Sequence, residues 1–254
     1  MPAKLYVVHG SHPCACVEKA LQLKGVPYRT VELPPPLHAP IQRVLFGRRT
    51  VPGIRFEDGE KQTGSRAILR RLEEQVPVPP LRPAEPGARA AVEDAEAWGD
   101  EVLQPVARRV LWPAIKRNPG ALPSYSQGSK LPLPDPVIKL NAPVIARAEI
   151  RLNDATEEAL RADLAALPGH LDRIDAYIAD GVMGGEEPNV ADLQIASTLR
   201  LLMTLEDLRP LIERRPAGAL ALRVFPDWNG RMPAGTLPAE WLPAPAPAPA
   251  PAAT

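Results

Sequence analysis

Cysteine and aromatic residues are scarce in this sequence, and it has no net charge. Its 254 residues include two cysteines, Cys14 and Cys16, and 4% are aromatic. Two cysteines this close together cannot supply the disulfide framework on which small secreted domains depend, which favours a reducing compartment. The formal net charge is zero, so bulk charge does not favour nucleic acid or a membrane surface as a partner. We expect neither partner.

Long apolar runs are missing as well. The N-terminus has no apolar segment of signal-peptide length, and no window reaches the roughly 18 uninterrupted apolar residues of a membrane span. The overall content of apolar residues is nevertheless 45%, which is ordinary for a soluble protein with a buried core. We therefore predict a cytoplasmic globular protein.

Proline, in contrast, is abundant, with 33 residues. A proline-rich break at 76–87 separates two parts with different patterns. We predict a first domain at 1–76, a linker at 77–87 and a second domain at 88–242. The Pro/Ala repeat at 243–254 has no apolar face to bury, and it is predicted to be a disordered tail.

Short strands and helices alternate in the first part. Apolar or alternating runs predict strands, helical spacing of apolar residues predicts helices, and an Asp-Gly turn predicts a hairpin. Ser65 is a good residue for the N-cap of the last helix. The order is β-α-β-α-β-β-α. In chain order the elements are expected near 4–8, 13–23, 28–33, 41–46, 51–56, 60–63 and 65–74.

Only helical patterns follow the proline-rich break. One long helix is expected from 88 to 112, with a bend at Pro105, and a loop is expected at 118–136. Asn189 and Asp192 resemble a capping box, in which each side chain caps the other residue's backbone. Asp192 is therefore expected to stabilise the fold rather than to take part in chemistry.

Four stretches of the sequence carry a family resemblance: SHPCACVEKALQLKGVPY, TVPGI, TGSRAIL and PNVADL. Together they resemble the cytosolic glutathione S-transferases. The stretch SHPCACVEKALQLKGVPY resembles the first turn and helix of that family, and TVPGI resembles its Val-Pro pair, in which the proline is cis. TGSRAIL and PNVADL resemble two further motifs, one in each part. The resemblance implies an α/β thioredoxin-like N-terminal domain (βαβαββα) followed by an all-α C-terminal domain. It also implies a homodimer.

Ser11 and Cys14 lie at the start of the predicted first helix, in the frame of the C-P-x-C motif of glutaredoxins, with serine in the first place. A helix N-terminus carries partial positive charge, which lowers the pKa of a thiol placed there. Ser11 could donate a hydrogen bond to a bound thiolate, or it could be a helix cap. Cys14 could react itself, or it could be a small buried residue. Cys16 is expected in the core and His12 in a solvent-facing loop.

Four residues are candidates for binding the thiol compound. The resemblance implies that Val51, before a cis Pro52, pairs through its backbone with the cysteinyl part of a glutathione-like peptide. It also implies that Ser65 and its helix N-terminus hold the γ-glutamyl carboxylate. The structural alternatives are an ordinary trans proline and a plain helix cap. Gly64 stands where the family often has Glu or Gln, which leaves the identity of the thiol open.

The resemblance thus implies a glutathione S-transferase-like enzyme that adds a small peptide thiol to an electrophile. Glutathione or another low-molecular-weight thiol would be the co-substrate. No metal is expected, because structural zinc usually takes four ligands and the chain has two thiols. Two alternatives remain: a glutathione-dependent thiol–disulfide oxidoreductase that uses Cys14, and a noncatalytic binding or scaffold protein with the same fold.

Overall fold

The structure is a computed structural model, and it describes residues 2–131 and 133–243. The predicted Pro/Ala tail lies outside the described residues from 244 onward. No helix in the described ranges is long and apolar enough to cross a membrane.

A mixed sheet of four strands, in the order β2-β1-β3-β4, forms the centre of the N-terminal part. Strand β1 (Ala3–Val7) runs parallel to β2 (Tyr28–Glu32) and antiparallel to β3 (Gly53–Arg55). The short β4 (Lys61–Thr63) pairs with β3 in a hairpin. The thioredoxin-like βαβαββα order expected from the sequence is confirmed.

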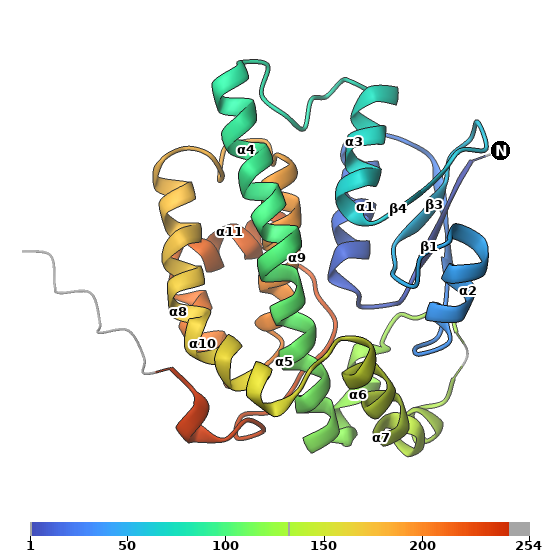
Figure 1. The fold of residues 1–254 in the computed structure, drawn as a ribbon, viewed down its shortest axis with the longest axis vertical. Helices are drawn as coiled ribbons and strands as arrows, with labels where there is room; N and C mark the ends of the chain where they lie inside the picture. The colour runs from blue at the N-terminus through green and yellow to red at the C-terminus, as the bar shows by residue number, and fades with distance from the viewer. Residues whose placement is uncertain (1, 132, 244–254) are drawn as a thin grey trace, which may run out of the picture.

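Helices cover both faces of this sheet (Figure 1). Helices α1 (His12–Leu23) and α3 (Ser65–Gln75) lie between the sheet and the second part of the chain, whereas α2 (His38–Phe46) lies on the outer side. The alternation of β1 explains this arrangement, because neighbouring side chains of a strand point to opposite faces. Leu5 is fully buried, and the adjacent Tyr6 contacts Phe46 of α2 edge to face at 5.2 Å between ring centroids.

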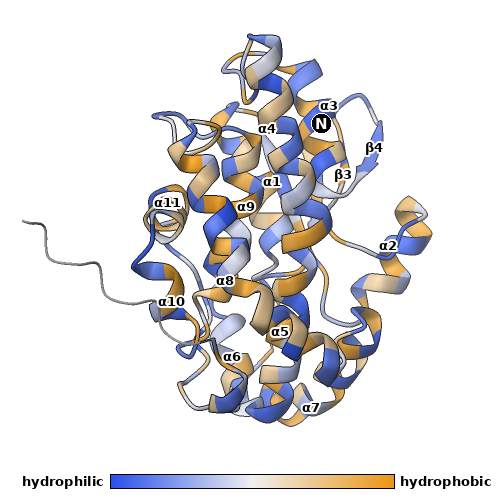
Figure 2. Cartoon of the chain, turned by 60° about the vertical axis from the view of Figure 1, so that its left-hand side comes forward, coloured by the Kyte–Doolittle hydropathy of each residue, from blue (hydrophilic) through white to orange (hydrophobic). Residues whose placement is uncertain are grey.

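The second part is helical, as expected, and Figure 2 shows that its helices mix hydrophilic and hydrophobic residues along their length, the pattern of amphipathic helices packed on a core. Its elements are α4 (Pro86–Trp98), a π-helical turn (Gly99–Leu103), α5 (Gln104–Arg117), a 3₁₀ turn (Pro119–Ala121), α6 (Leu122–Tyr125), α7 (Asp135–Leu152), α8 (Glu157–Ala179), α9 (Val190–Leu202), α10 (Arg209–Glu213), α11 (Pro216–Val224) and a final 3₁₀ turn (Ala239–Trp241).

The long helix predicted at 88–112 is interrupted by the π-helical turn, which ends two residues before Pro105. Proline has no N–H to donate to the carbonyl of Glu101, which explains the irregularity at this place. The turn also packs closely on α9. A Cβ added at Gly99 would lie 2.8 Å from Cγ1 of Ile195, so this contact requires glycine.

The prediction of a loop at 118–136 is wrong in part, because α6 lies inside this range and α7 begins at Asp135. The sequence analysis did not predict α7. Pro136 stands in its first turn, where proline is tolerated, but Pro143 lies inside the helix and obscures the helical pattern. Burial on α7 is confined to a narrow stripe at Ile138, Ala142, Ala146 and Glu149.

The two parts of the chain meet where α1 packs on α9. Cys16 is fully buried, as predicted, and its thiol Sγ lies 3.6 Å from Oε1 of Gln194 on α9. Every residue of α9 is buried, so this helix forms the centre of the second part. The N-terminus of α1 is thereby held against the helical part.

The capping box of α9 is present. Oδ2 of Asp192 accepts a hydrogen bond from the backbone N–H of Asn189 at 2.9 Å, and Oδ1 accepts one from Gly184 at 2.8 Å. Asn189 in turn accepts from the backbone of Ala191 at 2.9 Å. Asp192 is fully buried, so its removal leaves two backbone donors without a partner.

We expect Asp192→Ala to lower the free energy of unfolding by about 2 kcal/mol, because a cap and a buried acceptor are both lost. Urea denaturation measures the change. Asp94→Ala, at an exposed position of α4, is the control and should stay within about 0.5 kcal/mol of the wild type. Equal stability of the two variants would show that the capping box contributes little.

Candidate active site

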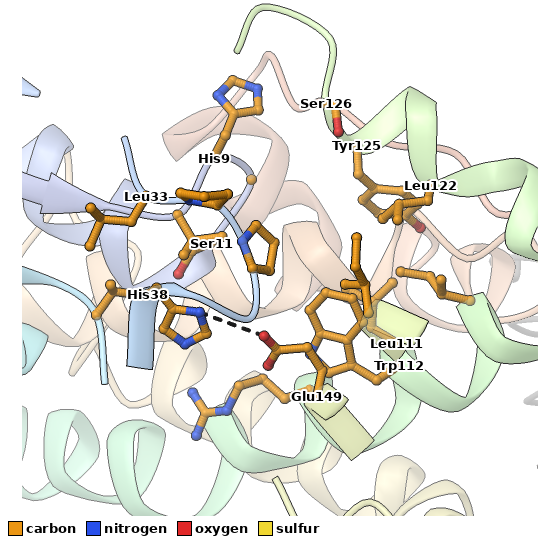
Figure 3. A pocket seen from close by; sticks show the side chains of 18 of the residues that line it. His9, Ser11, Leu33, His38, Leu111, Trp112, Leu122, Tyr125, Ser126 and Glu149 are labelled. Atoms are coloured by element: carbon orange, nitrogen blue, oxygen red, sulfur yellow. Dashed lines mark ion pairs between the residues drawn. The ribbon is translucent and has the colours of Figure 1, made fainter. Parts of the chain in front are cut away.

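A pocket of about 540 Å³ lies at the junction of the two parts (Figure 3). The loop before α1, the start of α2 and the helices α5, α6 and α7 contribute residues to it. Most of its walls are apolar. The apolar residues include Leu33, Leu111, Trp112, Leu122, Ile138 and Ile145.

Ser11 lies at this pocket, in the N-cap position of α1. Its side chain makes no capping hydrogen bond. The reading of Ser11 as only a helix cap is therefore not supported by the geometry. Its neighbours His12 and Pro13 also line the pocket, so the N-terminus of α1 borders the cavity. A helix N-terminus and a hydroxyl group together favour a bound anion.

Cys14 lies in the first turn of α1, but it is 2% exposed and is not among the residues that line the pocket. Burial raises the pKa of its thiol to about 12, although a hydrogen bond with Ser11 opposes that rise. The lowered pKa expected from the helix N-terminus is therefore wrong, because the desolvation of a thiolate outweighs the dipole here. A thiol with this pKa is a poor nucleophile at neutral pH.

His12 is not in a solvent-facing loop, and that expectation is wrong. It is the first residue of α1 and is 1% exposed. Burial lowers the pKa of its imidazole well below the usual value, and the nearby Arg108 of α5 lowers it further. His12 is therefore neutral at pH 7. Arg108 and Gln104 of α5 lie close to it, which the sequence around Gly10 does not reveal.

Val51 lines the pocket, and the peptide bond between Val51 and Pro52 is cis, as the resemblance implies. Pro52, Gly64 and Ser65 do not line the pocket. Gly64, rather than Ser65, holds the N-cap position of α3, so the prediction that Ser65 caps this helix is wrong by one residue. The Ser65 hydroxyl is buried and has no hydrogen-bond partner among the described residues.

A histidine and a glutamate that the sequence analysis missed face one another in the pocket (Figure 3). Nδ1 of His38, the first residue of α2, lies 3.6 Å from Oε1 of Glu149 on α7. Burial raises the pKa of Glu149 to about 7 and lowers the pKa of His38. No signal in the sequence links the two, because α7 itself was not predicted.

Tyr125 contributes a phenol to the pocket, but its hydroxyl is engaged. Oη lies 2.9 Å from Oγ1 of Thr204, and burial raises the pKa of the phenol to about 12. The hydroxyl of Ser11 is also bonded, to the thiol of Cys14, but it lies at the N-terminus of α1, where a bound thiolate is favoured.

Residues 5–80 match the family model described as the glutathione S-transferase N-terminal domain. The chain carries the N-terminal domain of this family. The recognition made from the sequence is thereby confirmed. No curated protein matches the sequence significantly.

Solved structures show the same fold along most of the chain. A beta-etherase from Sphingobium sp. strain SYK-6 is 18% identical, with a TM-score of 0.59 over 88% of this chain and 99% of that one. A glutathione S-transferase from Rhodospirillum rubrum F11 is 23% identical, with a TM-score of 0.56 over 87% and 91%. A theta class glutathione S-transferase from Xanthomonas axonopodis pv. citri, solved with glutathione bound, is 18% identical, with a TM-score of 0.55 over 88% and 97%.

Within residues 2–131 and 133–243, no group of three or more His, Cys, Asp or Glu side chains could hold a metal ion.

Proposed function

We propose that this protein is a glutathione S-transferase-type enzyme that activates a small thiol beside Ser11 and adds it to an electrophile. The single observation that carries the proposal is the position of Ser11. Its hydroxyl is free of any capping bond and lies at a helix N-terminus that borders a large pocket. The homodimer and the cytoplasmic location remain predictions.

Ser11 and Val51, which line the pocket, fit a glutathione-like peptide. Ser65 does not line the pocket, but its buried hydroxyl has no hydrogen-bond partner among the described residues and lies at the N-terminus of α3, where a carboxylate is favoured. Val51 borders the pocket and would pair with the peptide backbone. Ser11 would donate its hydrogen to the thiolate, which lowers the pKa of the bound thiol. When bound, the thiol compound supplies the nucleophile.

The pocket restricts the class of electrophile. Its walls are mainly apolar and include Trp112, Leu111 and Ile145. Such walls exclude strongly hydrated ligands and favour aromatic or alicyclic molecules. The alternative of a disulfide oxidoreductase is less favoured, because Cys14 is buried and the pKa of its thiol is raised to about 12.

We expect Ser11→Ala to slow conjugation of glutathione to an activated aryl chloride at pH 7 by about tenfold, since one unit in the thiol pKa changes the thiolate population tenfold. Steady-state kinetics and the pH profile of kcat/KM measure this effect. In the variant, the acidic limb of the profile should shift to higher pH.

Cys14→Ser is the matched control and should leave conjugation within about twofold of the wild type, because the buried thiol does not carry the reaction. The opposite result would support the disulfide oxidoreductase instead: Cys14→Ser would no longer reduce a mixed disulfide, and Ser11→Ala would reduce it as fast as the wild type. A wild type with neither activity would leave a noncatalytic binding protein.

A further inference from the structure

Exposed apolar side chains are concentrated on α2 and α7. Among the residues that the structure describes, nine large apolar side chains are exposed, and seven of them lie at 37–46 or 133–152. These seven are Leu37, Val44, Leu133, Val137, Leu140, Val144 and Leu152. Single exposed apolar residues are ordinary in a folded protein, but a cluster of them marks a site of interaction. This cluster therefore needs an occupant.

The cluster points away from the core of the protein. On α7 the residues Val137, Leu140 and Val144 follow one another at spacings of three and four, so they share the side of the helix opposite its narrow buried stripe. On α2 the exposed Leu37 and Val44 likewise lie opposite the buried side. The two helices border the same pocket, and both lie at the periphery of the molecule (Figures 1 and 2).

Positive charge accompanies the apolar cluster. Six exposed cationic side chains on the same segments form no ion pair with any residue of 2–131 or 133–243: Arg43, Arg48, Arg49, Lys139, Arg147 and Arg151. Residues 37–49 contain no Asp or Glu, and the acids of 133–152 are Asp135 and the buried Glu149. The net charge of the whole chain is zero, so this excess of positive charge is local. A partner for this surface has to carry negative charge.

Two possible occupants fit these observations poorly. A second copy of this chain would bring the same unpaired cations against each other, and like charges repel. A peptide helix binds in a groove, whereas Val44 and Leu140 are 85% and 80% exposed and stand out from the surface. An anionic lipid bilayer needs no groove, because apolar side chains enter its headgroup region while Arg and Lys contact the phosphates.

We infer that this surface, which we call the α2–α7 face, docks the protein onto an anionic lipid bilayer. The face consists of the seven apolar side chains and the six cations named above. Leu133, Leu152 and Arg49 of this face also line the pocket, so docking brings the opening of the pocket to the lipid. The inference goes beyond the proposed function and does not rest on it, because lipid binding needs neither Ser11 nor a thiol.

Cosedimentation of the full chain with lipid vesicles tests the inference. Vesicles of equal parts phosphatidylglycerol and phosphatidylcholine should bind the protein. Vesicles of phosphatidylcholine alone, which carry no net charge, should bind it at least about tenfold more weakly. Binding to the anionic vesicles should weaken as NaCl is raised from about 0.05 M to about 0.5 M, since salt screens the cations of the face.

Two double variants separate the charges of the face from its apolar side chains. Arg147→Gln with Arg151→Gln should weaken binding to the anionic vesicles about 25-fold, since each cation near such a surface strengthens binding about fivefold. Leu140→Gln with Val144→Gln should weaken it by about tenfold or more, because less apolar area enters the headgroup region. The second variant should keep the salt dependence of the wild type, because its cations are unchanged.

The matched control is Arg70→Gln with Arg214→Gln, which removes two exposed cations outside the face. This variant should bind the anionic vesicles within about twofold of the wild type. All three double variants should keep the melting temperature of the wild type within about 3 °C, because every replaced side chain is exposed.

Four results would overturn the inference. Wild-type protein that does not sediment with the anionic vesicles would show that the face does not dock on lipid. Equal binding of the wild type and Arg147→Gln with Arg151→Gln would place the lipid contact elsewhere. Without vesicle binding, self-association that Leu140→Gln with Val144→Gln abolishes would assign the face to a second copy, and binding of a synthetic Glu-rich amphipathic peptide would assign it to an acidic helix.

The outcomes of this test and of the test of the proposed function are independent. A wild type that binds the anionic vesicles but conjugates no electrophile would overturn the proposed function and leave this inference in place. A wild type that conjugates the aryl chloride but does not bind the vesicles would do the opposite.

Discussion

Replacement of Arg82 by alanine should lower the free energy of unfolding by about 3 kcal/mol, the lower end of the cost of breaking a buried ion pair, because Arg66, whose Nε lies 4.0 Å from Oε2 of Glu96, remains beside that carboxylate. Nη2 of Arg82 contacts both carboxylate oxygens of Glu96, at 3.2 and 2.9 Å, and Glu96 is 1% exposed. Arg82 lies in the proline-rich segment between α3 and α4, so this pair anchors the predicted linker to α4. Urea denaturation at pH 8 measures the loss.

The loss in Arg82→Ala should shrink as the pH falls. Burial already raises the pKa of Glu96, and Arg82 opposes that rise. Without Arg82 the pKa rises further, so the folded state binds a proton more readily than the unfolded state. A carboxyl group with a raised pKa destabilises the fold increasingly as the pH rises through that pKa. The deficit should therefore be smaller at pH 5 than at pH 8.

Two controls separate this effect from a general loss of packing. Arg70→Ala, at an exposed position of α3, should change stability by less than about 0.5 kcal/mol. The double variant Arg82→Met with Glu96→Leu should recover most of the loss, because replacing both partners of a buried pair by apolar residues is often neutral. A pH-independent deficit in Arg82→Ala would contradict the electrostatic explanation.

Glu149→Gln should raise the free energy of unfolding at pH 8 by about 3 kcal/mol, which follows from a difference of more than two pKa units. The pKa of Glu149 is raised from 4.5 to about 7 by burial. The wild type therefore loses stability as the pH rises from the pKa of Glu149 in the unfolded chain through its raised pKa in the folded protein. Glutamine carries no charge and avoids this cost at pH 8.

At pH 4 the side chain at position 149 is neutral in the wild type as well as in Glu149→Gln, so the stabilities of the two proteins should be nearly equal. Denaturation curves at half-unit steps between pH 4 and pH 8 would trace the divergence. Glu158→Gln, at an exposed position in the first turn of α8, should run parallel to the wild type at every pH. A Glu149→Gln variant that is less stable than the wild type at pH 8 would show that the carboxylate is well solvated or paired.

The N-terminal domain could be predicted closely from the sequence, because its signals are local. The apolar run before Gly10, the Asp58-Gly59 turn and the helical spacing after Pro13 each act within a few residues. The capping box at Asn189 is equally local, since both partners lie within one helical turn. Ser11 was found for the same reason, because a hydroxyl before a helix start is visible in the sequence.

The errors about Cys14 and His12 have one cause in common, which is burial by segments far away in the chain. Cys14 has the local setting of a reactive thiol, but tertiary packing desolvates it and raises its pKa to about 12. His12 lies beside a proline in what reads as a loop, yet it is buried, and Arg108 and Gln104 of α5 lie close to its imidazole. Local spacing contains no information on the dielectric surroundings of a side chain.

The sequence by itself therefore determined the order of the elements in the first domain, the family of that domain and the serine at the first helix. The tertiary structure alone decided which of the remaining polar groups face the pocket. His38 and Glu149 are more than a hundred residues apart, and their atoms lie 3.6 Å from each other only because α2 and α7 border one cavity. Their protonation depends on water being excluded from that cavity, and this exclusion is a property of the packed fold.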